Sequence, residues 1–136
     1  MKSLTDDMYK IMVKRAYDVC ACTPKNVSVH LNGNKLDIKA FDKYVDLYLG
    51  VDKTENPRVH DYNERWEVVA APSPDGRFHQ TSFVNGIHTI RGGTHVNHVV
   101  NQICKKLSEL VKKKLKKTVK VQYIKDHLSV FIRSVI

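Results

Sequence analysis

The sequence of 136 residues lacks several features that assign a chain to a broad class of protein. It has no run of about eighteen apolar residues, which a membrane-spanning helix requires. Its first ten residues contain no apolar segment of the kind found in export signals. It has only three cysteines, without the spacing of a zinc site, and we interpret Cys20, Cys22 and Cys104 as reduced thiols of an intracellular protein. What remains is one domain, or a piece of one, with enough apolar residues for a core.

Motifs of catalysis are also missing. The sequence contains no G-x-S-x-G nucleophile motif, no phosphate-binding loop with its lysine and no H-E-x-x-H zinc motif. His95 and His98 are one helical turn apart, but no third and fourth ligand follow at a suitable spacing, so we expect structural histidines and no metal site. The segment Arg91–Thr94 precedes a helix and is able to bind an anion there. Its short glycine pattern favours a simple chain reversal instead.

Acidic residues are scarce in the last third of the chain. Between Lys105 and Arg133 there are ten Lys and Arg residues, opposed only by Glu109 and Asp126, and this block holds most of the net charge of +9. Such a block indicates a surface that binds a polyanion. The alternative is that the block binds no partner and is a solvated helix end, where lysines suit the negative end of the helix dipole.

One stretch, residues 83–111, organises the rest of the sequence. Gly92 and Gly93 supply the backbone freedom of a tight turn, and Thr94 is a natural N-cap for a helix that follows. Apolar residues then recur at spacings of three and four, which predicts an amphipathic helix of five or six turns. They are Val96, Val99, Val100, Ile103, Cys104, Leu107, Leu110, Val111 and Leu115.

The other segments indicate an α+β fold. Ser3 and Asp6 resemble a capping box at the start of a first helix, whose apolar side includes Ile11 and Met12. Asn32-Gly33 is a strong hairpin signal. We further expect strands at 27–31, 35–39, 65–71, 78–84 and 128–136, a short helix near 41–49, and a loop at 51–58. The turn at 72–76 predicts that 65–71 and 78–84 pair directly, and the sequence 78–136 predicts a strand–helix–strand crossover.

The segment FVNGIHTIRGGTHVNHVVNQICKKL closely resembles the transducer domain of eukaryotic-type DNA topoisomerase II, a type IIA topoisomerase. Four further segments match that family in the same order: MVKRAYDVCAC, VHLNGNKLDIKAFDKYVDLYL, NERWEVVAAPSPDGRFHQTSFVN and KDHLSVFIRSVI. The resemblance therefore covers essentially the whole chain. Gly86 and His88 depart from it, because the family often has Ser and Ala at these positions.

The resemblance implies a split β-α-β two-layer sandwich, the ribosomal-protein-like second-domain fold, with a mainly antiparallel sheet, one long helix and helices on one face. Residues 1–24 correspond to a helix continuing from the ATP-binding domain. Residues 25–136 correspond to a transducer domain truncated at its C-terminal side. The last apolar strand has no polar tail, which also suggests a piece of a larger protein.

The function that the resemblance implies is that of a coupling module in an ATP-hydrolysing DNA topoisomerase, an isomerase. It implies ATP and Mg²⁺ as cofactors of the parent enzyme, DNA and the rest of the same polypeptide as partners, a homodimeric parent, a nuclear location and no membrane. The ATP-binding and strand-cleaving residues of the family fall outside this chain. We therefore expect no catalytic residue, no bound cofactor and no activity in the chain alone.

Two sets of site residues follow from the resemblance. The family's lysine-rich DNA-facing loop corresponds to Lys112, Lys113, Lys114, Lys116 and Lys117, and the hinge or turn before the long helix corresponds to Gly92, Gly93 and Thr94. Two other functions stay open at this stage. One is a free-standing nucleic-acid-binding domain of similar split β-α-β fold, and the other is a small metal-dependent enzyme that uses His95 and His98.

Overall fold

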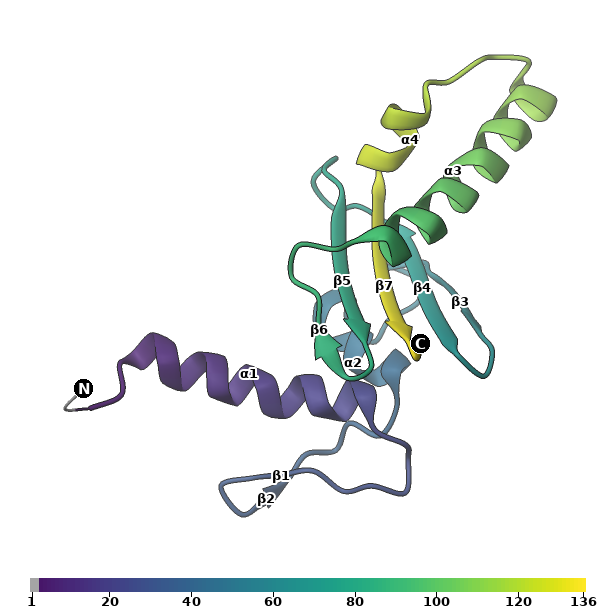
Figure 1. The fold of residues 1–136 in the computed structure, drawn as a ribbon. Helices are drawn as coiled ribbons and strands as arrows, with labels where there is room; N and C mark the ends of the chain where they lie inside the picture. Colours follow the sequence, from purple (N-terminus) through teal and green to yellow (C-terminus); the bar gives the residue numbers. More distant parts are fainter. Residues whose placement is uncertain (1–2) are drawn as a thin grey trace.

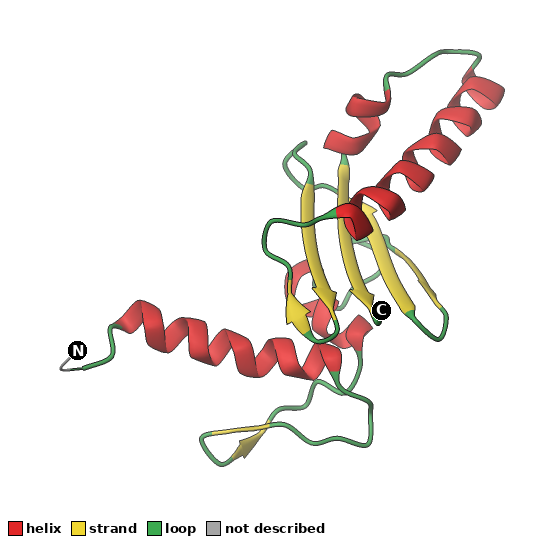
Figure 2. Ribbon diagram, viewed as in Figure 1, coloured by secondary structure: helices red, strands yellow, loops and turns green. Residues whose placement is uncertain are grey.

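The computed structural model describes residues 3–136 and has an α+β fold, as predicted (Figures 1 and 2). Its centre is a five-stranded sheet in the order β3-β4-β7-β5-β6. The strands are β3 (Val59–Tyr62), β4 (Trp66–Pro72), β5 (His79–Val84), β6 (Ile87–His88) and β7 (Leu128–Ser134). All neighbouring strands are antiparallel except β5 and β7, which are parallel. The sheet is therefore mainly antiparallel, as expected.

Strand β7 lies between β4 and β5, which corrects the expectation that these two strands pair directly. Phe131 is opposite Val69 on one side and opposite Thr81 on the other. Six of the seven residues of β7 are buried. A strand this apolar is most stable with a neighbour on each side and helices on both faces. The turn after β4 thus connects two strands that β7 separates.

Strand β5 is followed by its partner β6, and helix α3 (Thr94–Leu115) and the short α4 (Val121–Asp126) then lead to β7 and cover one face of the sheet. This confirms both the predicted crossover and the predicted length of the helix. Val96, Val100 and Cys104 of α3 are buried against Val130 and Ile132 of β7. The predicted stripe is buried only in its first half, because Leu110 is 49% and Leu115 65% exposed. The second half of α3 extends past the sheet (Figure 1).

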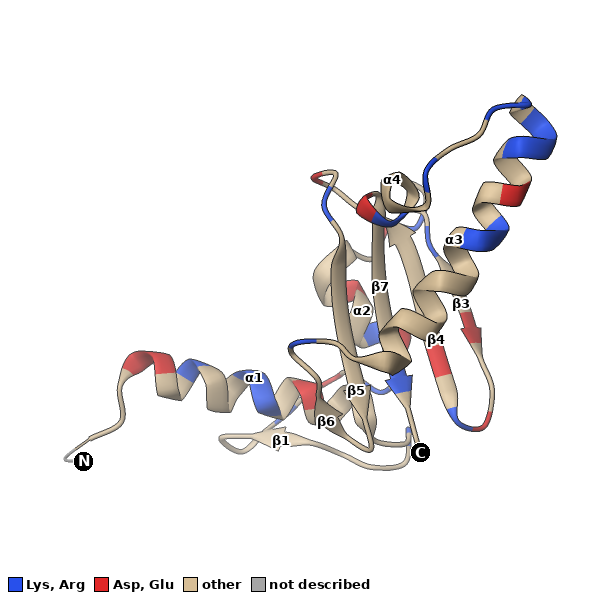
Figure 3. Cartoon of the chain, turned by 45° about the horizontal axis from the view of Figure 1, so that its top comes forward, with Lys and Arg blue, Asp and Glu red and all other residues tan. Residues whose placement is uncertain are grey.

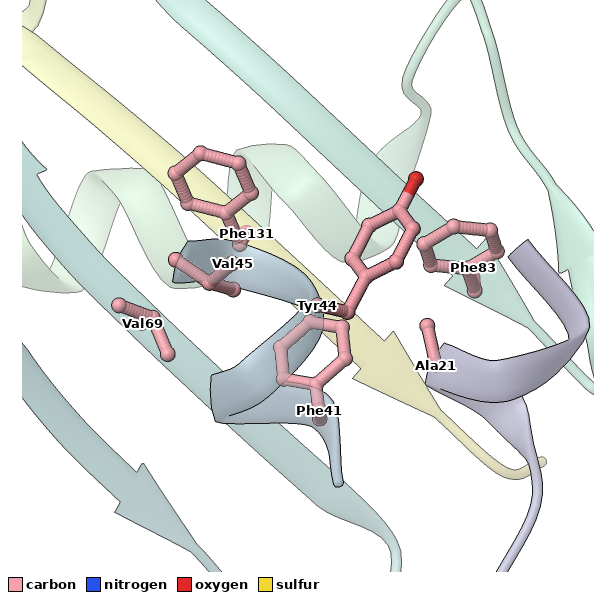
Figure 4. Close-up of a cluster of buried hydrophobic side chains, with 7 residues drawn as sticks. All are labelled: Ala21, Phe41, Tyr44, Val45, Val69, Phe83 and Phe131. Atoms are coloured by element: carbon pink, nitrogen blue, oxygen red, sulfur yellow. The ribbon is translucent and has the colours of Figure 1, made fainter. Parts of the chain in front are cut away.

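Helix α2 (Phe41–Leu49) covers the opposite face, so the expectation of helices on one face only is wrong. A tight cluster forms between this helix, the end of the first helix and the sheet (Figure 4). Its buried members are Ala21, Phe41, Tyr44, Val45, Val69, Phe83 and Phe131. The alternation of side chains along β4, β5 and β7 supplies both faces with apolar groups, and each face therefore requires a cover.

Helix α1 (Asp6–Cys22) begins later than predicted and has Thr5, not Ser3, as its N-cap. The hydroxyl of Thr5 accepts a hydrogen bond from the Met8 amide at 3.3 Å. The predicted apolar side of α1 is not a core face in its first turns, since Ile11 is 67% and Met12 57% exposed. Spacing alone identified an amphipathic helix but not where its partner lies.

The hairpin at Asn32-Gly33 is present, although its strands are shorter than predicted. They are β1 (His30–Leu31) and β2 (Asn34–Lys35). Both turn residues have positive φ, 50° and 81°, as a two-residue hairpin turn requires. The edge strand β3 was not expected from the sequence. Its four residues are all exposed, and it owes its form to pairing with β4.

Candidate nucleic-acid interface

The basic block lies at the far end of α3, beyond the edge of the sheet (Figure 3). Lys112, Lys113 and Lys114 form the last turn of the helix. Lys116 ends it in the left-handed conformation, with φ 51° and ψ 28°, and Lys117 follows in the irregular connection to α4. All five side chains are exposed. The negative end of the helix dipole favours cations at this end of the helix.

None of these five lysines takes part in an ion pair within residues 3–136. Their charges therefore remain available to an external anion. The structure brings the five lysines together on one projecting end, with three of them in the last helical turn and not in a loop. The contact of these lysines with DNA stays a prediction.

The basic surface extends along α3 beyond the five predicted residues. Lys105 and Lys106 are exposed and come seven positions before Lys112 and Lys113. Seven residues are two helical turns, so each pair shares a side of the helix. Lys105 and Lys106 belong to the basic block of the sequence but not to the predicted DNA-facing set. The spacing of seven was the signal that would have included them.

An apolar groove of about 1200 Å³ lies beside the basic end. It runs between α3, α4 and the strands β3 and β4, and its floor includes Trp66, Val68 and Ala70. One wall is formed by residues of the α3 stripe, from the partly buried Ile103 to the exposed Leu107 and Leu115. This groove was not predicted from the sequence, because the apolar stripe does not indicate how far the sheet extends beneath the helix.

The glycine turn before α3 is built as a rigid corner. Gly92 and Gly93 have φ of 71° and 152°, and Gly93 is the N-cap. Thr94 is the first helical residue, which corrects its prediction as the N-cap. The Gln80 amide donates a 2.9 Å hydrogen bond to the Ile90 carbonyl beneath the turn, and a Cβ placed on Gly92 would lie 3.6 Å from that amide nitrogen.

His95 and His98 point to different neighbours. The Nε2 atom of His95 lies 3.0 Å from the hydroxyl of Thr89, and burial lowers the pKa of this imidazole. The Nε2 atom of His98 lies 2.8 Å from the Gln102 side chain on the solvent side of α3. Their contacts are thus with a threonine and a glutamine rather than with each other. Across residues 3–136, no group of three His, Cys, Asp or Glu side chains is placed to hold a metal ion.

The cysteines are also placed as packing residues. Cys20 and Cys104 are buried, and burial raises the pKa of both thiols. Cys22 is partly buried, which raises its pKa to about 11. A thiol with a raised pKa is a poor nucleophile at neutral pH.

Among the helices in the described part of the chain, none has the length and apolar character needed to cross a membrane.

The fold is shared with solved structures of the ATPase region of topoisomerase II. The ATPase region of the Saccharomyces cerevisiae enzyme matches with a TM-score of 0.85 and 41% identity, covering 100% of this chain and 34% of that one. The ATPase and transducer domains of DNA topoisomerase II from Balamuthia mandrillaris match with a TM-score of 0.86 and 41% identity, with the same coverage. DNA gyrase B-subunit from Myxococcus xanthus, at 17% identity and a TM-score of 0.60, shares the fold.

A family model described as DNA gyrase B matches residues 30–136, and the chain belongs to this family. Its relatives include DNA topoisomerase 2-alpha of Sus scrofa, 48% identical over 143 residues, and DNA topoisomerase 2 of Arabidopsis thaliana, 43% identical over 143 residues. Both alignments cover 100% of this chain but only 9% and 10% of the relatives. The resemblance that the sequence analysis identified is thereby confirmed.

Proposed function

We propose that this chain is the transducer module of an ATP-dependent type II DNA topoisomerase and contacts DNA through Lys112, Lys113, Lys114, Lys116 and Lys117. In this proposal, residues 1–24 continue from the ATP-binding domain and residues 25–136 belong to the transducer. The module couples ATP binding and hydrolysis to DNA strand passage. The parent enzyme is a nuclear homodimer that uses ATP and Mg²⁺.

The observation that carries the DNA contact is the exposed, unpaired group of lysines where α3 extends past the sheet. Elsewhere in the described chain, charges are often neutralised locally, as by the pairs Arg58–Asp46 and Arg133–Glu67. At the end of α3 the nearest acidic residue in the helix is Glu109, which is itself exposed. A flexible, exposed group of ammonium ions suits contact with phosphates and carries no base-specific geometry.

We expect the sites for ATP and Mg²⁺ to lie outside this chain. The described part has no cluster of carboxylates or imidazoles for a metal ion. The glycine turn is too short for a nucleotide loop, and its inner side is occupied by Gln80 and His95. In this proposal, nucleotide chemistry belongs to other parts of the parent polypeptide.

The salt dependence of DNA binding tests the proposal. Changing Lys112, Lys113, Lys116 and Lys117 to Ala removes four candidate phosphate contacts. Each lost contact lowers the slope of log K against log salt by about 0.9 on duplex DNA, so the expected loss is roughly three to four units, with little change in sequence preference. Binding is measured by fluorescence anisotropy over a salt series, with circular dichroism as the folding control.

A matched control changes Lys10, Lys35, Lys39 and Lys53 to Ala, four exposed lysines outside the basic block. It alters the net charge by the same amount and is expected to leave most of the slope intact. If both quadruple variants lose equal slope, the binding is non-specific and the proposed surface is wrong. An unchanged slope in the folded α3 variant would identify the lysines as a solvated helix end.

A further inference from the structure

Among the described residues, helix α1 is buried against the rest of the molecule only near its end, although the Tyr9 hydroxyl in its first turns accepts a 3.3 Å hydrogen bond from Asn32 of the β1–β2 hairpin. Its buried residues are Asp18, Cys20 and Ala21, all in the last five positions. Ile11 and Met12, two turns earlier, are exposed. In Figure 1 the helix extends away from the sheet, with its C-terminal end beside α2. The hairpin is not part of the five-stranded sheet, so the buried end of α1 is its direct attachment to the sheet and to α2.

A buried carboxylate is the polar centre of the attachment. Asp18 is 3% exposed, and its Oδ1 atom accepts a 2.7 Å hydrogen bond from the Tyr44 hydroxyl on α2. Lys14 donates to both carboxylate oxygens at 2.9 Å. The Nδ1 atom of His88, on β6, lies 4.0 Å from Oδ2. One side chain of α1 thus faces groups from α1 itself, α2 and β6.

Tyr44 connects this carboxylate to the core. Its side chain is 1% exposed and its ring packs edge-on against Phe83 of β5, with centroids 5.7 Å apart. The ring belongs to the buried cluster beneath α2, and its hydroxyl points out of that cluster (Figure 4). Burial, followed by the hydrogen bonds to Tyr48 and Asp18, raises the pKa of Tyr44, so the hydroxyl stays protonated and remains a donor.

Attaching a helix through a buried charge has a high desolvation cost, and apolar side chains of similar size often stabilise the contact at least as well. A charged hydrogen bond, unlike an apolar contact, constrains the distance and the direction between the two groups that it joins. Cys20 and Ala21 contribute only small side chains to this attachment, and the Ala21 carbonyl accepts a long hydrogen bond, 3.5 Å, from Nη1 of Arg133 on β7. The bond from Tyr44 to Asp18 fixes the rotation of α1 about its axis, because turning the helix would move the carboxylate away from its donor.

We propose that the Asp18–Tyr44 hydrogen bond is the joint through which α1 transmits movement to α2 and the sheet. This inference rests on the proposed function, in which α1 leads from the ATP-binding domain into the transducer. It assigns positioning roles to Asp18 and Tyr44, with Lys14 neutralising the carboxylate.

Hydrogen exchange in the 136-residue chain tests whether the joint exists. Tyr44→Phe removes one oxygen and keeps the ring in the core, and Asp18→Asn keeps the shape of the acceptor without its charge. Both are expected to speed amide exchange in the second half of α1 by about tenfold, because a hydrogen bond to a charged group is lost, while α3 and β7 keep their protection.

Tyr48→Phe is the matched control. It makes the same change one turn further along α2, where the hydroxyl lies 2.9 Å from that of Tyr44 but is not bonded to Asp18. It is expected to leave exchange in α1 unchanged. Equal exchange in α1 for Tyr44→Phe and the unmodified chain would overturn the proposal. If Asp18→Asn fails to fold, the result for Tyr44→Phe decides.

The parent enzyme tests whether the joint transmits movement. Tyr44→Phe is expected to reduce DNA stimulation of ATP hydrolysis severalfold and to leave basal hydrolysis unchanged, whereas Tyr48→Phe changes neither. Normal stimulation with Tyr44→Phe would overturn the joint and leave the proposed DNA contact intact. Loss of the DNA contact is detected separately, by the salt series with the lysine variants. The two failures are therefore distinguishable.

Discussion

Arg58 and Asp46 form a buried ion pair that fastens the irregular segment 50–58 to the end of α2. Their Nη1 and Oδ1 atoms are 2.8 Å apart, and the two side chains are 4% and 6% exposed. The Nη2 atom of Arg58 also donates to the Gly50 carbonyl at 2.6 Å. One guanidinium thus neutralises a buried carboxylate and caps a helix end, which is a geometry that the planar fork of arginine suits.

Replacing Arg58 with Ala is expected to lower the free energy of unfolding by about 3 kcal/mol, because Asp46 then remains buried with only the exposed Lys43 at 3.5 Å. Arg58→Lys restores the charge but not both hydrogen bonds, and its loss should be smaller. Urea unfolding followed by circular dichroism measures both. A loss below about 1 kcal/mol for Arg58→Ala would place the pair among weak surface bridges.

Acidification is expected to destabilise the chain through His88 and His95. Burial lowers the pKa of both imidazoles below the usual 6.5, and for His88 the nearby Lys14 adds to this. At pH values between the lowered pKa values and 6.5, the unfolded chain therefore binds more protons than the folded chain. The stabilisation is complete above pH 6.5 and is lost as the pH falls through the lowered pKa values.

The measurement is the free energy of unfolding in urea at pH 8, 6.5 and 5.5. His88→Ala should make the decrease toward acid shallower, because one of the two shifted groups is gone. The values at pH 8, where the imidazoles are neutral, report any loss of packing on its own. A decrease as steep as that of the unmodified chain would contradict the role of His88.

Gly93→Ala is expected to destabilise the start of α3. A side chain at this residue adopts φ 152° only with strain, and its Cβ would lie 3.0 Å from the His95 ring. Strain of this kind costs about 1–3 kcal/mol. Combining it with His95→Ala removes the contact but not the φ strain, so the cost of Gly93→Ala should fall in that background without vanishing. Equal costs in both backgrounds would show that the ring is not the obstacle.

Two residues of the same apolar stripe should respond differently to truncation. Val100 is 1% exposed and Leu115 is 65% exposed. Val100→Ala is expected to cost about 2 kcal/mol through lost burial and the cavity left behind. Leu115→Ala should stay within about 0.5 kcal/mol, as for other exposed positions. Similar losses for the two variants would mean that the end of α3 is packed in solution.

Local signals predicted the elements that have strong internal patterns. The spacing of apolar residues identified α3, the run of apolar residues identified β7, and Asn32-Gly33 identified the hairpin. The order of strands had no such signal. The insertion of β7 between β4 and β5 depends on pairing between residues far apart in sequence, and it overrides the tendency of neighbouring strands to pair. Strand β3 also lacks a local signal, since the segment VHDY is a strand only because it pairs with β4.

The candidate interface was predictable only in the part that depends on local sequence. Charge counting and the family resemblance led to Lys112 and its neighbours, because charge is a property of the sequence itself. The projection of α3 beyond the sheet, which exposes Leu110 and Leu115, depends on the length of the sheet beneath. The joint at Asp18 was not predicted either. A single acidic residue on a helix gives no sign that Tyr44, from another helix, will bury it.

The position of β7 also has a consequence for biosynthesis. On the ribosome, β4 and β5 are made well before β7, which emerges only after α3 and α4. Until then the two earlier strands expose unpaired edges and apolar faces, and their pairing with each other would have to be undone later. Translation at roughly 5–20 residues per second leaves them in this state for several seconds. The nascent chain should therefore be most prone to aggregation, and most in need of a chaperone, in the interval before its central strand arrives.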